Sequence, residues 1–212
     1  MRETGREALL LYILIGEDDF SQHQALEEIK RSVGDPTLLA ANTTTLDGQQ
    51  AELSQLRMVC QTLPFLAERR LVIVRGLFER FEPKSKPKGK TTSRLPSQTG
   101  ECKSFVDCLS KIPDSTILVL VDSAISSHNP LFVELSKKAE VKSFPPLRGT
   151  KLRQWIGGRV KAEGGSISPE AVNLLARVVG SHLWIMANEI NKLVLFTAGR
   201  RIEEEDVKTV VS

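Results

Sequence analysis

Short apolar runs, separated by segments with helical periodicity, constrain the fold of this chain more than any other feature of the sequence. The runs Leu9–Ile15 and Ile117–Val121 are continuously apolar and do not alternate with polar residues. Continuous runs of this length are typical of strands that are buried on both faces, as in parallel sheets. We expect five strands, at Leu9–Ile15, Asn42–Leu46, Leu71–Val74, Ile117–Val121 and Val141–Phe144, of which Asn42–Leu46 is short and Thr-rich rather than apolar.

The segments between these runs carry apolar residues at helical spacing. Ser21 and Gln24 form an S-x-x-Q capping box, which predicts that a helix begins there. A second helix is expected over Gln50–Thr62, and Asn129-Pro130 predicts the start of another. The apolar stripe of the second helix comprises Leu53, Leu56, Cys60 and Leu63. Strands that alternate with helices require crossover connections, so the predicted fold class is α/β with a five-stranded parallel sheet.

The last third of the chain has a different pattern. The segment Leu152–Val160 is amphipathic, Ser168-Pro169-Glu170 is a helix-start signal, and Ser181 is a candidate cap for a further helix. This part of the sequence is predicted to be helical throughout. We therefore expect an α/β domain over residues 1–148 and a small all-helical domain over residues 149–212.

Composition limits the class of protein. The 212 residues are 41% hydrophobic and 26% charged, as in ordinary globular proteins, which excludes a wholly disordered or collagen-like chain. The longest apolar run, Ala8–Ile15, is far shorter than the roughly 20 residues of a membrane span. It does not resemble a signal peptide, because Gly16 and three acidic residues follow where small cleavage-site residues belong. We expect a cytoplasmic protein with no membrane partner.

Positive charge is concentrated in one segment, Pro83–Gly100. Five basic residues lie within it, and without them the net charge of +3 falls by five to −2. Prolines, glycines and polar residues dominate the segment, which predicts a flexible surface insertion. The alternative is a basic arm that contacts the phosphates of DNA, without interleaved aromatic residues for base stacking. The candidate phosphate contacts are Lys84, Lys86, Lys88, Lys90 and Arg94.

The loop after the first apolar run is the place where an α/β domain of this kind would bind a nucleotide. Such a loop needs the pattern G-x-x-x-x-G-K-[ST], whose backbone amides cradle phosphate and whose Lys neutralises it. Gly16 is instead followed by Glu17, Asp18 and Asp19, which repel phosphate. The fourth run ends in a single acidic residue, Asp122, and not in the paired acids that hold magnesium and water at such a site. We expect no ATP binding, no ATP hydrolysis and no cofactor.

Other chemistry has little support in the sequence. The motif G-x-S-x-G does not occur, although a Ser/His/Asp triad stays open because its members need not be neighbours. Cys102 and Cys108 have no histidine nearby and lack the spacing of a zinc site. Asp18 and Asp19 offer a magnesium site as an alternative to an acidic helix start. We predict no catalytic residue and no metal ligand.

The segment Leu63–Arg70 is a candidate binding site. Phe65 and Leu66 are large, apolar and adjacent, and they follow Pro64 in a turn between a helix and a strand. These two side chains either close the top of the core or form an exposed apolar wedge that enters a partner's pocket. As exposed anchors, each would contribute roughly 1.5–3 kcal/mol if it were fully buried on binding.

Four segments carry a resemblance to a known family: Tyr12–Phe20, Leu63–Val74, Pro146–Ile156 and Gly180–Leu193. The second contains FLAERRLV, and the fourth ends in NEINKL. In this order they resemble the delta subunit of the bacterial DNA polymerase III clamp loader, over nearly all of the chain. The resemblance implies an AAA+-like domain of the P-loop type with a degenerate nucleotide site, followed by a helical lid domain.

The resemblance also implies a function in DNA replication. A delta subunit binds and opens the ring-shaped sliding clamp (the beta subunit) with a hydrophobic wedge, and it has no catalysis of its own. By position the wedge is the pair Phe65-Leu66, with Leu63 and Pro64 as supporting neighbours. ATP would act through the other clamp-loader subunits, gamma/tau and delta-prime, and DNA would be met through the assembled complex.

Two features depart from the family pattern. The basic insertion at residues 83–100 is one, and the other is the lack of a third, helical collar domain that assembles the pentameric loader. We expect a fragment that binds the clamp but joins the ring poorly. Two other functions stay as alternatives. One is a nucleotide-dependent ATPase or helicase fragment, which needs ATP at the Gly16 loop, and the other is a stand-alone DNA-binding protein that uses Lys84–Arg94.

Overall fold

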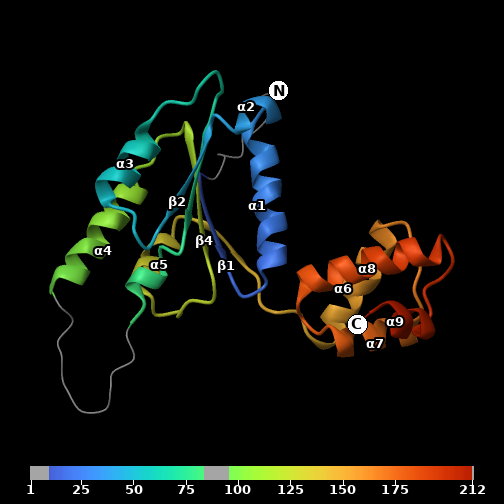
Figure 1. Ribbon diagram of the computed structural model, residues 1–212. Helices are drawn as coiled ribbons and strands as arrows, with labels where there is room; N and C mark the ends of the chain where they lie inside the picture. Colours follow the sequence, from blue (N-terminus) through green and yellow to red (C-terminus); the bar gives the residue numbers. More distant parts are fainter. Residues whose placement is uncertain (1–9, 84–95, 212) are drawn as a thin grey trace, which may run out of the picture. The chain divides into compact units, whose positions relative to one another are not determined.

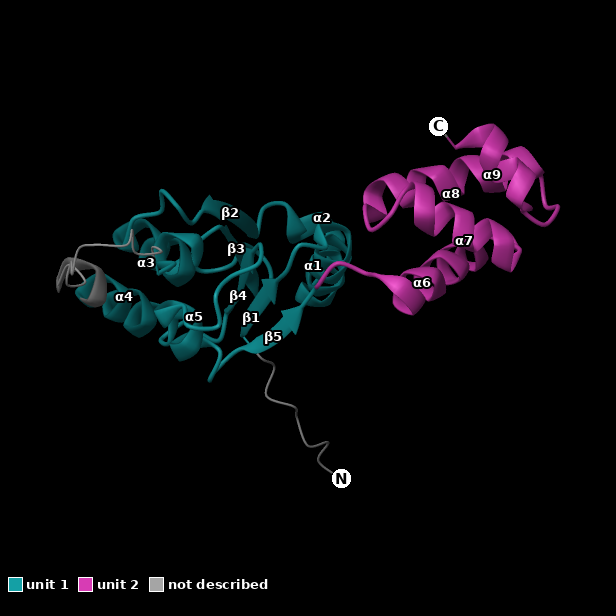
Figure 2. Cartoon of the chain, turned by 90° about the horizontal axis from the view of Figure 1, so that it is seen from below, with its two compact units in different colours: residues 1–144 teal, residues 145–212 magenta. Residues whose placement is uncertain are grey.

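The chain forms two compact units, Met1–Phe144 and Pro145–Ser212 (Figure 2). A computed structural model describes residues 10–83 and 96–211, except for the side chains of residues 96–99. Among these residues, no helix is both long enough and apolar enough to cross a membrane. The two units differ in class, since the first combines a sheet with helices and the second contains helices.

Unit 1 is built on a five-stranded sheet in which every neighbouring pair of strands is parallel, with the order β2-β3-β4-β1-β5. The central strand β4 is buried along its whole length, and Leu118 pairs with Leu11 on one side and with Val72 on the other. This architecture confirms the predicted α/β class. The strands are β1 (Leu11–Ile15), β2 (Thr43–Asp47), β3 (Arg70–Arg75), β4 (Thr116–Asp122) and β5 (Glu140–Ser143).

Helices cover both faces of this sheet, which explains why the inner strands β1, β3 and β4 are largely apolar, whereas the outer strands β2 and β5 are more polar and partly exposed. The helices of unit 1 are α1 (Asp19–Val33), α2 (Pro36–Leu39), α3 (Leu53–Gln61), α4 (Pro96–Leu109) and α5 (Pro130–Leu135), with a short 3-10 helix η1 (Glu79–Phe81). Helix α1 packs on one face, and α3, α4 and α5 pack on the other (Figure 1).

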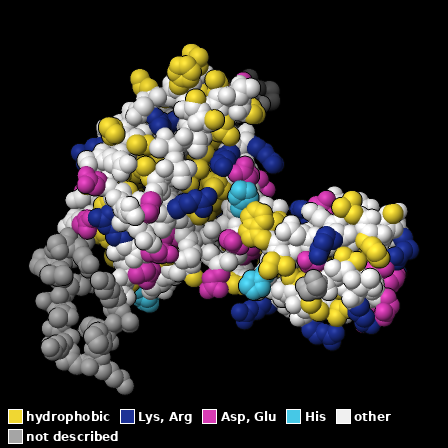
Figure 3. All heavy atoms as spheres, viewed as in Figure 1, with side chains coloured by type: hydrophobic (Ala, Val, Ile, Leu, Met, Phe, Trp, Pro, Cys, Tyr) yellow, Lys and Arg dark blue, Asp and Glu magenta, His cyan; other side chains and the backbone are white. Residues whose placement is uncertain are grey.

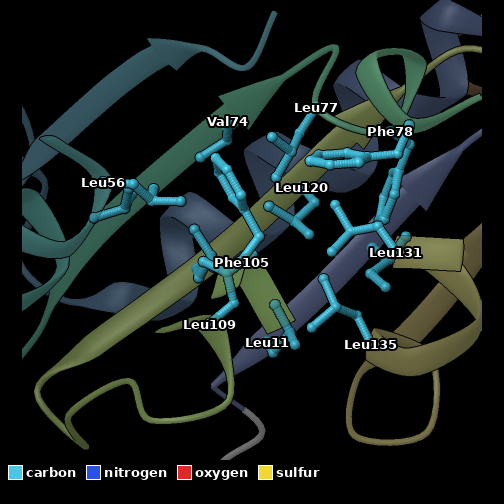
Figure 4. Packing of buried hydrophobic residues seen from close by; sticks show 14 of the residues in the cluster. Leu11, Leu56, Val74, Leu77, Phe78, Phe105, Leu109, Leu120, Leu131 and Leu135 are labelled. Atoms are coloured by element: carbon cyan, nitrogen blue, oxygen red, sulfur yellow. The ribbon is translucent and has the colours of Figure 1, made fainter. Parts of the chain in front are cut away.

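Successive residues of the buried strands pack into the cores on opposite faces of the sheet. In β4, Leu118 and Leu120 belong to the core beneath α3, α4 and α5, whereas Val119 and Val121 belong to the core beneath α1. The larger core also contains aromatic side chains from η1 and α4, whose rings meet edge to face at a centroid separation of 5.5 Å. Figure 4 shows this core, in which the labelled leucines and phenylalanines of the sheet and of the covering elements point toward one another.

Several helix ends follow the sequence pattern, and others correct it. Asn129 caps α5 as expected, because its side-chain oxygen accepts hydrogen bonds from the amides of Leu131 and Phe132. The predicted capping box at Ser21 is wrong. Helix α1 begins two residues earlier, because the Asp18 carboxylate already accepts the Ser21 amide at 3.0 Å.

Unit 2 is all-helical and consists of α6 (Gly149–Ala162), α7 (Pro169–Val178), α8 (Leu183–Thr197) and α9 (Glu204–Val210). Ser168 caps α7 through the Ala171 amide, as predicted, whereas His182 and not Ser181 precedes α8. Asp206 fixes the start of α9, because its carboxylate accepts a hydrogen bond from the Glu203 amide at 2.9 Å. It also accepts hydrogen bonds from the two terminal guanidinium nitrogens of Arg200, each at 2.8 Å. This pairing lowers the pKa of Asp206 to about 2. The core contains Leu152, Ile156, Val160, Leu175, Met186, Ile190, Leu193 and Val207.

Gly16, directly after β1, lies closely packed against the backbone of Phe144. Its φ of 144° lies in a region that side-chain-bearing residues rarely adopt, and a Cβ atom would lie 2.1 Å from the carbonyl oxygen of Phe144. We predict that Gly16→Ala lowers the free energy of unfolding by about 2 kcal/mol or more, because both backbone segments must shift.

Chemical denaturation of the chain measures this effect, and Gly100→Ala is the matched control. Gly100 lies inside α4, where a Cβ atom would meet nothing within 4 Å. Alanine should therefore stabilise that helix by about 0.5–1 kcal/mol. Equal effects of the two substitutions would contradict the predicted clash at Gly16.

Candidate protein-binding site

Among the described residues of unit 1, the connection between α3 and β3 carries the most exposed apolar side chains. Leu63 is 80% exposed, Phe65 61% and Leu66 77%, while Pro64 is partly buried. We call residues Leu63–Leu66 the apolar loop. The alternative in which these side chains close the core is therefore wrong, as is the placement of Leu63 on the buried stripe, because α3 ends at Gln61. Hydrophobic side chains gather at the corresponding end of unit 1 in Figure 3.

Buried polar side chains hold the backbone of this connection. Asn42, which is only 3% exposed, accepts a hydrogen bond from the Phe65 amide at 2.6 Å and donates one to the Phe65 carbonyl at 2.9 Å. Arg70, at the start of β3, is 7% exposed and donates to the carbonyl of Thr62 at 3.2 Å and to the hydroxyl of Thr44 at 2.9 Å. The apolar side chains therefore project from a backbone that is fixed on both sides.

The conformation within the loop is unusual at one position. Leu66 has a φ of 50°, in the left-handed region that residues with a Cβ atom seldom occupy. At the other end of the connection, the Thr116 hydroxyl donates to the carbonyl of Cys60 at 2.7 Å and anchors the last turn of α3 to β4. One turn before the loop, Met58 adds a further apolar side chain that is 65% exposed.

The Gly16 loop lies at the opposite edge of the sheet, because it follows the carboxyl end of β1 whereas the apolar loop precedes the amino end of β3. Its backbone amides donate to groups of unit 1 itself. The Gly16 amide donates to the carbonyl of Asp122 at 3.3 Å, and the Asp18 amide donates to the carbonyl of Phe144 at 3.0 Å. In a phosphate-binding loop such amides point toward the ligand.

The Gln22 side chain closes the Gly16 loop further. This residue is 7% exposed, and its amide nitrogen lies within 3.4 Å of the carbonyl oxygens of Leu14, Gly16 and Asp122, with the shortest distance, 2.6 Å, to Asp122. The side chain therefore ties β1, the loop and β4 together. No sequence motif marked it, because its partners lie on two different strands.

The comparisons with known proteins agree with this architecture. The family model for the delta subunit of DNA polymerase III matches residues 12–145. The chain belongs to this family. DNA polymerase III subunit delta of Bacillus subtilis (strain 168) is 26% identical over 204 residues, which cover 95% of this chain and 56% of that protein. This delta-family chain thus spans little more than half the length of that relative.

Solved structures share the fold of the delta-family chain. The DNA clamp loader delta protein of Bacillus subtilis superposes with a TM-score of 0.68 and 24% identity, over 96% of this chain and 58% of the other. Domain III of the replication initiation protein DnaA from Thermotoga maritima superposes with a TM-score of 0.50 and 11% identity, over 97% and 85%. At these identities the likeness concerns the fold alone.

The cysteines and acidic residues that the sequence offered as metal ligands have other environments in the delta-family chain. Cys60 and Cys102 are buried, Cys108 is partly buried, and all three are free thiols. Burial raises the pKa of Cys60 to about 12, which keeps it protonated. Asp18 lies at an acidic helix start, where it is buried and caps α1. Within residues 10–83 and 96–211, no cluster of three or more His, Cys, Asp or Glu side chains could hold a metal ion.

The basic segment and the polar residues beneath the apolar loop differ in what the structure describes of them. The candidate phosphate contacts Lys84, Lys86, Lys88, Lys90 and Arg94 lie outside the described residues. Sequence reasoning also missed Asn42 and Arg70, which hold the apolar loop. The one available signal was their position at the start of a predicted strand or directly before it, where a buried Arg or Asn needs hydrogen-bond partners.

Asp122, at the carboxyl end of β4, is a buried acid that this delta-family chain does not pair with a cation among its described residues. One carboxylate oxygen accepts the Glu79 amide at 3.4 Å, and the other has no hydrogen-bond partner within the same part of the chain. Burial raises the pKa of Asp122 from 3.8 to about 7, against the opposing effect of backbone amides from η1 and its approach. The charged carboxylate is therefore a source of instability at neutral pH.

We predict that Asp122→Asn stabilises the chain above pH 7 and loses this advantage toward pH 4. Between these values the folded protein keeps the Asp122 proton while the unfolded chain releases it, so wild-type stability falls as the pH rises through this window. Each pKa unit corresponds to about 1.4 kcal/mol, which places the full effect at a few kcal/mol.

Urea denaturation at a series of pH values measures the difference between variant and wild type. Asp114→Asn, at an exposed carboxylate, controls for the loss of one negative charge. A difference between Asp122→Asn and wild type that stays constant from pH 4 to pH 8 would contradict the raised pKa.

Proposed function

We propose that this chain acts in a clamp loader, where it binds the ring-shaped sliding clamp and favours the opened ring. The contact is the apolar loop, in which Phe65 and Leu66 enter a pocket of the clamp and Leu63 and Pro64 support them. Membership of the delta family supports the assignment, as does the shared fold with the DNA clamp loader delta protein of Bacillus subtilis. The observation that carries it is an exposed, adjacent Phe-Leu pair on a backbone fixed by buried side chains.

The magnitude of the contact suits this task. Full burial of a Phe or Leu side chain contributes roughly 1.5–3 kcal/mol, and exposed anchors of this kind dominate protein interfaces. Such a contact opens a ring only to the extent that it binds the opened or strained interface more tightly than the closed one. The chain therefore performs work through differential affinity and needs no catalytic group.

The second part of the proposal is that this chain neither binds nor hydrolyses ATP. Support comes from the Gly16 loop, whose sequence lacks the Lys and hydroxyl of a phosphate site. The internal hydrogen bonds of the Gly16 and Asp18 amides also support it, since these donors are already used. ATP then acts through other clamp-loader subunits, the gamma/tau and delta-prime chains, and DNA is reached through the assembled complex.

The proposal predicts that Phe65→Ala combined with Leu66→Ala weakens binding to the sliding clamp of the same organism by at least about a hundredfold. Losing two anchors of this size removes about 3 kcal/mol or more, and each 1.4 kcal/mol is a factor of ten in Kd. Isothermal titration calorimetry measures the affinity, and thermal melting checks that the fold is retained.

A matched control exists on α8, where Leu195 and Phe196 form another adjacent exposed pair, 80% and 54% exposed. The variant Leu195→Ala with Phe196→Ala removes the same side chains from the surface and should leave clamp affinity unchanged. A folded Phe65/Leu66 variant that binds the clamp as well as wild type would overturn the proposed contact. ATP titrated into the wild-type chain should give no binding heat, and measurable binding would favour the ATPase alternative.

A further inference from the structure

Asn42 is the best-connected polar side chain near the apolar loop. It lies between α2 and β2, and its own backbone is fixed on both sides. The Asn42 amide lies 3.1 Å from the carbonyl of Leu38, and its carbonyl accepts the amide of Leu71 in β3 at 2.8 Å. The side chain adds a hydrogen bond from its amide group to the Leu38 carbonyl at 3.0 Å. Asn42 is therefore an anchored platform and not a mobile surface group.

The side-chain amide of Asn42 forms a pair of hydrogen bonds with the backbone of Phe65, as a neighbouring strand would. Its oxygen accepts the Phe65 amide at 2.6 Å, and its nitrogen donates to the Phe65 carbonyl at 2.9 Å. The orientation of the amide follows from its partners, since the nitrogen faces two carbonyls and the oxygen faces an N–H group. Phe65 is thereby held in register at both of its backbone polar groups.

The two hydrogen bonds from Asn42 restrain the loop at Phe65, between two residues with unusual backbones. The preceding residue, Pro64, has no amide hydrogen to donate, and the following residue, Leu66, has the left-handed φ of 50°. A left-handed conformation costs a residue with a Cβ atom on the order of 1 kcal/mol, so an unrestrained loop would leave it. The double hydrogen bond to Asn42, directly before Leu66, opposes that relaxation.

We propose that Asn42 is a positioning residue that holds Phe65 and Leu66 in their binding geometry before the partner arrives, an inference that rests on the proposed clamp contact. Ordering a loop on binding weakens affinity, because backbone and side-chain freedom is lost at that moment. Asn42 removes most of that loss in advance. It touches no partner itself and acts only through the backbone of the apolar loop.

The test compares Asn42→Ala with Asn129→Ala. Asn129 is also a fully buried asparagine, with its oxygen on the Leu131 and Phe132 amides and its nitrogen on the Phe78 carbonyl. It lies at the carboxyl edge of the sheet, away from the apolar loop. A purely structural role predicts similar consequences for both substitutions, whereas a positioning role makes clamp affinity sensitive to Asn42 alone.

Two readouts are measured well below the melting temperature of each variant. The first is the affinity for the sliding clamp, where Asn42→Ala should weaken binding about tenfold or more and Asn129→Ala less than about twofold. The second is fast backbone motion at the amides of Leu63, Phe65 and Leu66 from NMR relaxation, which needs no partner and should increase only in the Asn42 variant. If Asn42→Ala does not fold, Asn42→Asp replaces it, since it keeps an acceptor for the Phe65 amide and loses both donors.

Clamp affinity within twofold of wild type in a folded Asn42 variant would overturn the positioning role, as would unchanged loop motion. Equal losses of affinity in the Asn42 and Asn129 variants would also overturn it, because they would point to general destabilisation. A wild-type chain that does not bind the clamp refutes the proposed function instead. In that case the NMR readout still decides whether Asn42 orders the loop.

Discussion

The strands of unit 1 all run in the same direction, and this constraint determines where each loop can lie. In a parallel sheet each crossover leaves from the carboxyl edge and returns to the amino edge. The Gly16 loop and the end of β4 therefore meet at one edge, whereas the α3–β3 connection lies at the opposite edge. Helices must cover both faces of such a sheet, so the edges are where loops of unit 1 remain available for contact with other molecules.

At both edges most buried polar groups form hydrogen bonds within unit 1, and the edges differ in the side chains that they present to solvent. At the carboxyl edge, the amides of Gly16 and Asp18 and the side chain of Gln22 all point to groups of the same unit. At the amino edge, Asn42 and Arg70 satisfy the backbone from beneath, which leaves the apolar side chains of the loop directed outward. An unsatisfied buried polar group costs about 1–3 kcal/mol, so the hydrogen bonds that are formed help to specify both arrangements. The exposed apolar side chains at the amino edge suit the binding role proposed for the apolar loop.

A subunit that acts by binding alone benefits from a rigid contact surface. Large exposed apolar side chains are a liability for a free protein, and they are tolerated where a partner covers them. A loop whose backbone is already held loses little entropy when it is bound, so under the proposed function more of the burial energy of Phe65 and Leu66 would be available to discriminate between states of the partner. Family membership alone does not supply this argument, since it depends on the hydrogen bonds beneath the loop.

The sequence by itself determined the order and type of the elements that could be compared. The strands fall within two residues of their predicted bounds, because the continuous apolar runs of the inner strands suit a sheet that is covered on both faces. Helix starts were less secure, since Ser21 and Asp18 both suit a cap and only the packed structure selected Asp18. The sequence also left open whether Phe65 and Leu66 are buried or exposed. Tertiary structure alone decided this point, because Asn42 reaches Phe65 across 23 residues and Thr116 reaches Cys60 across 56, contacts that local periodicity does not encode.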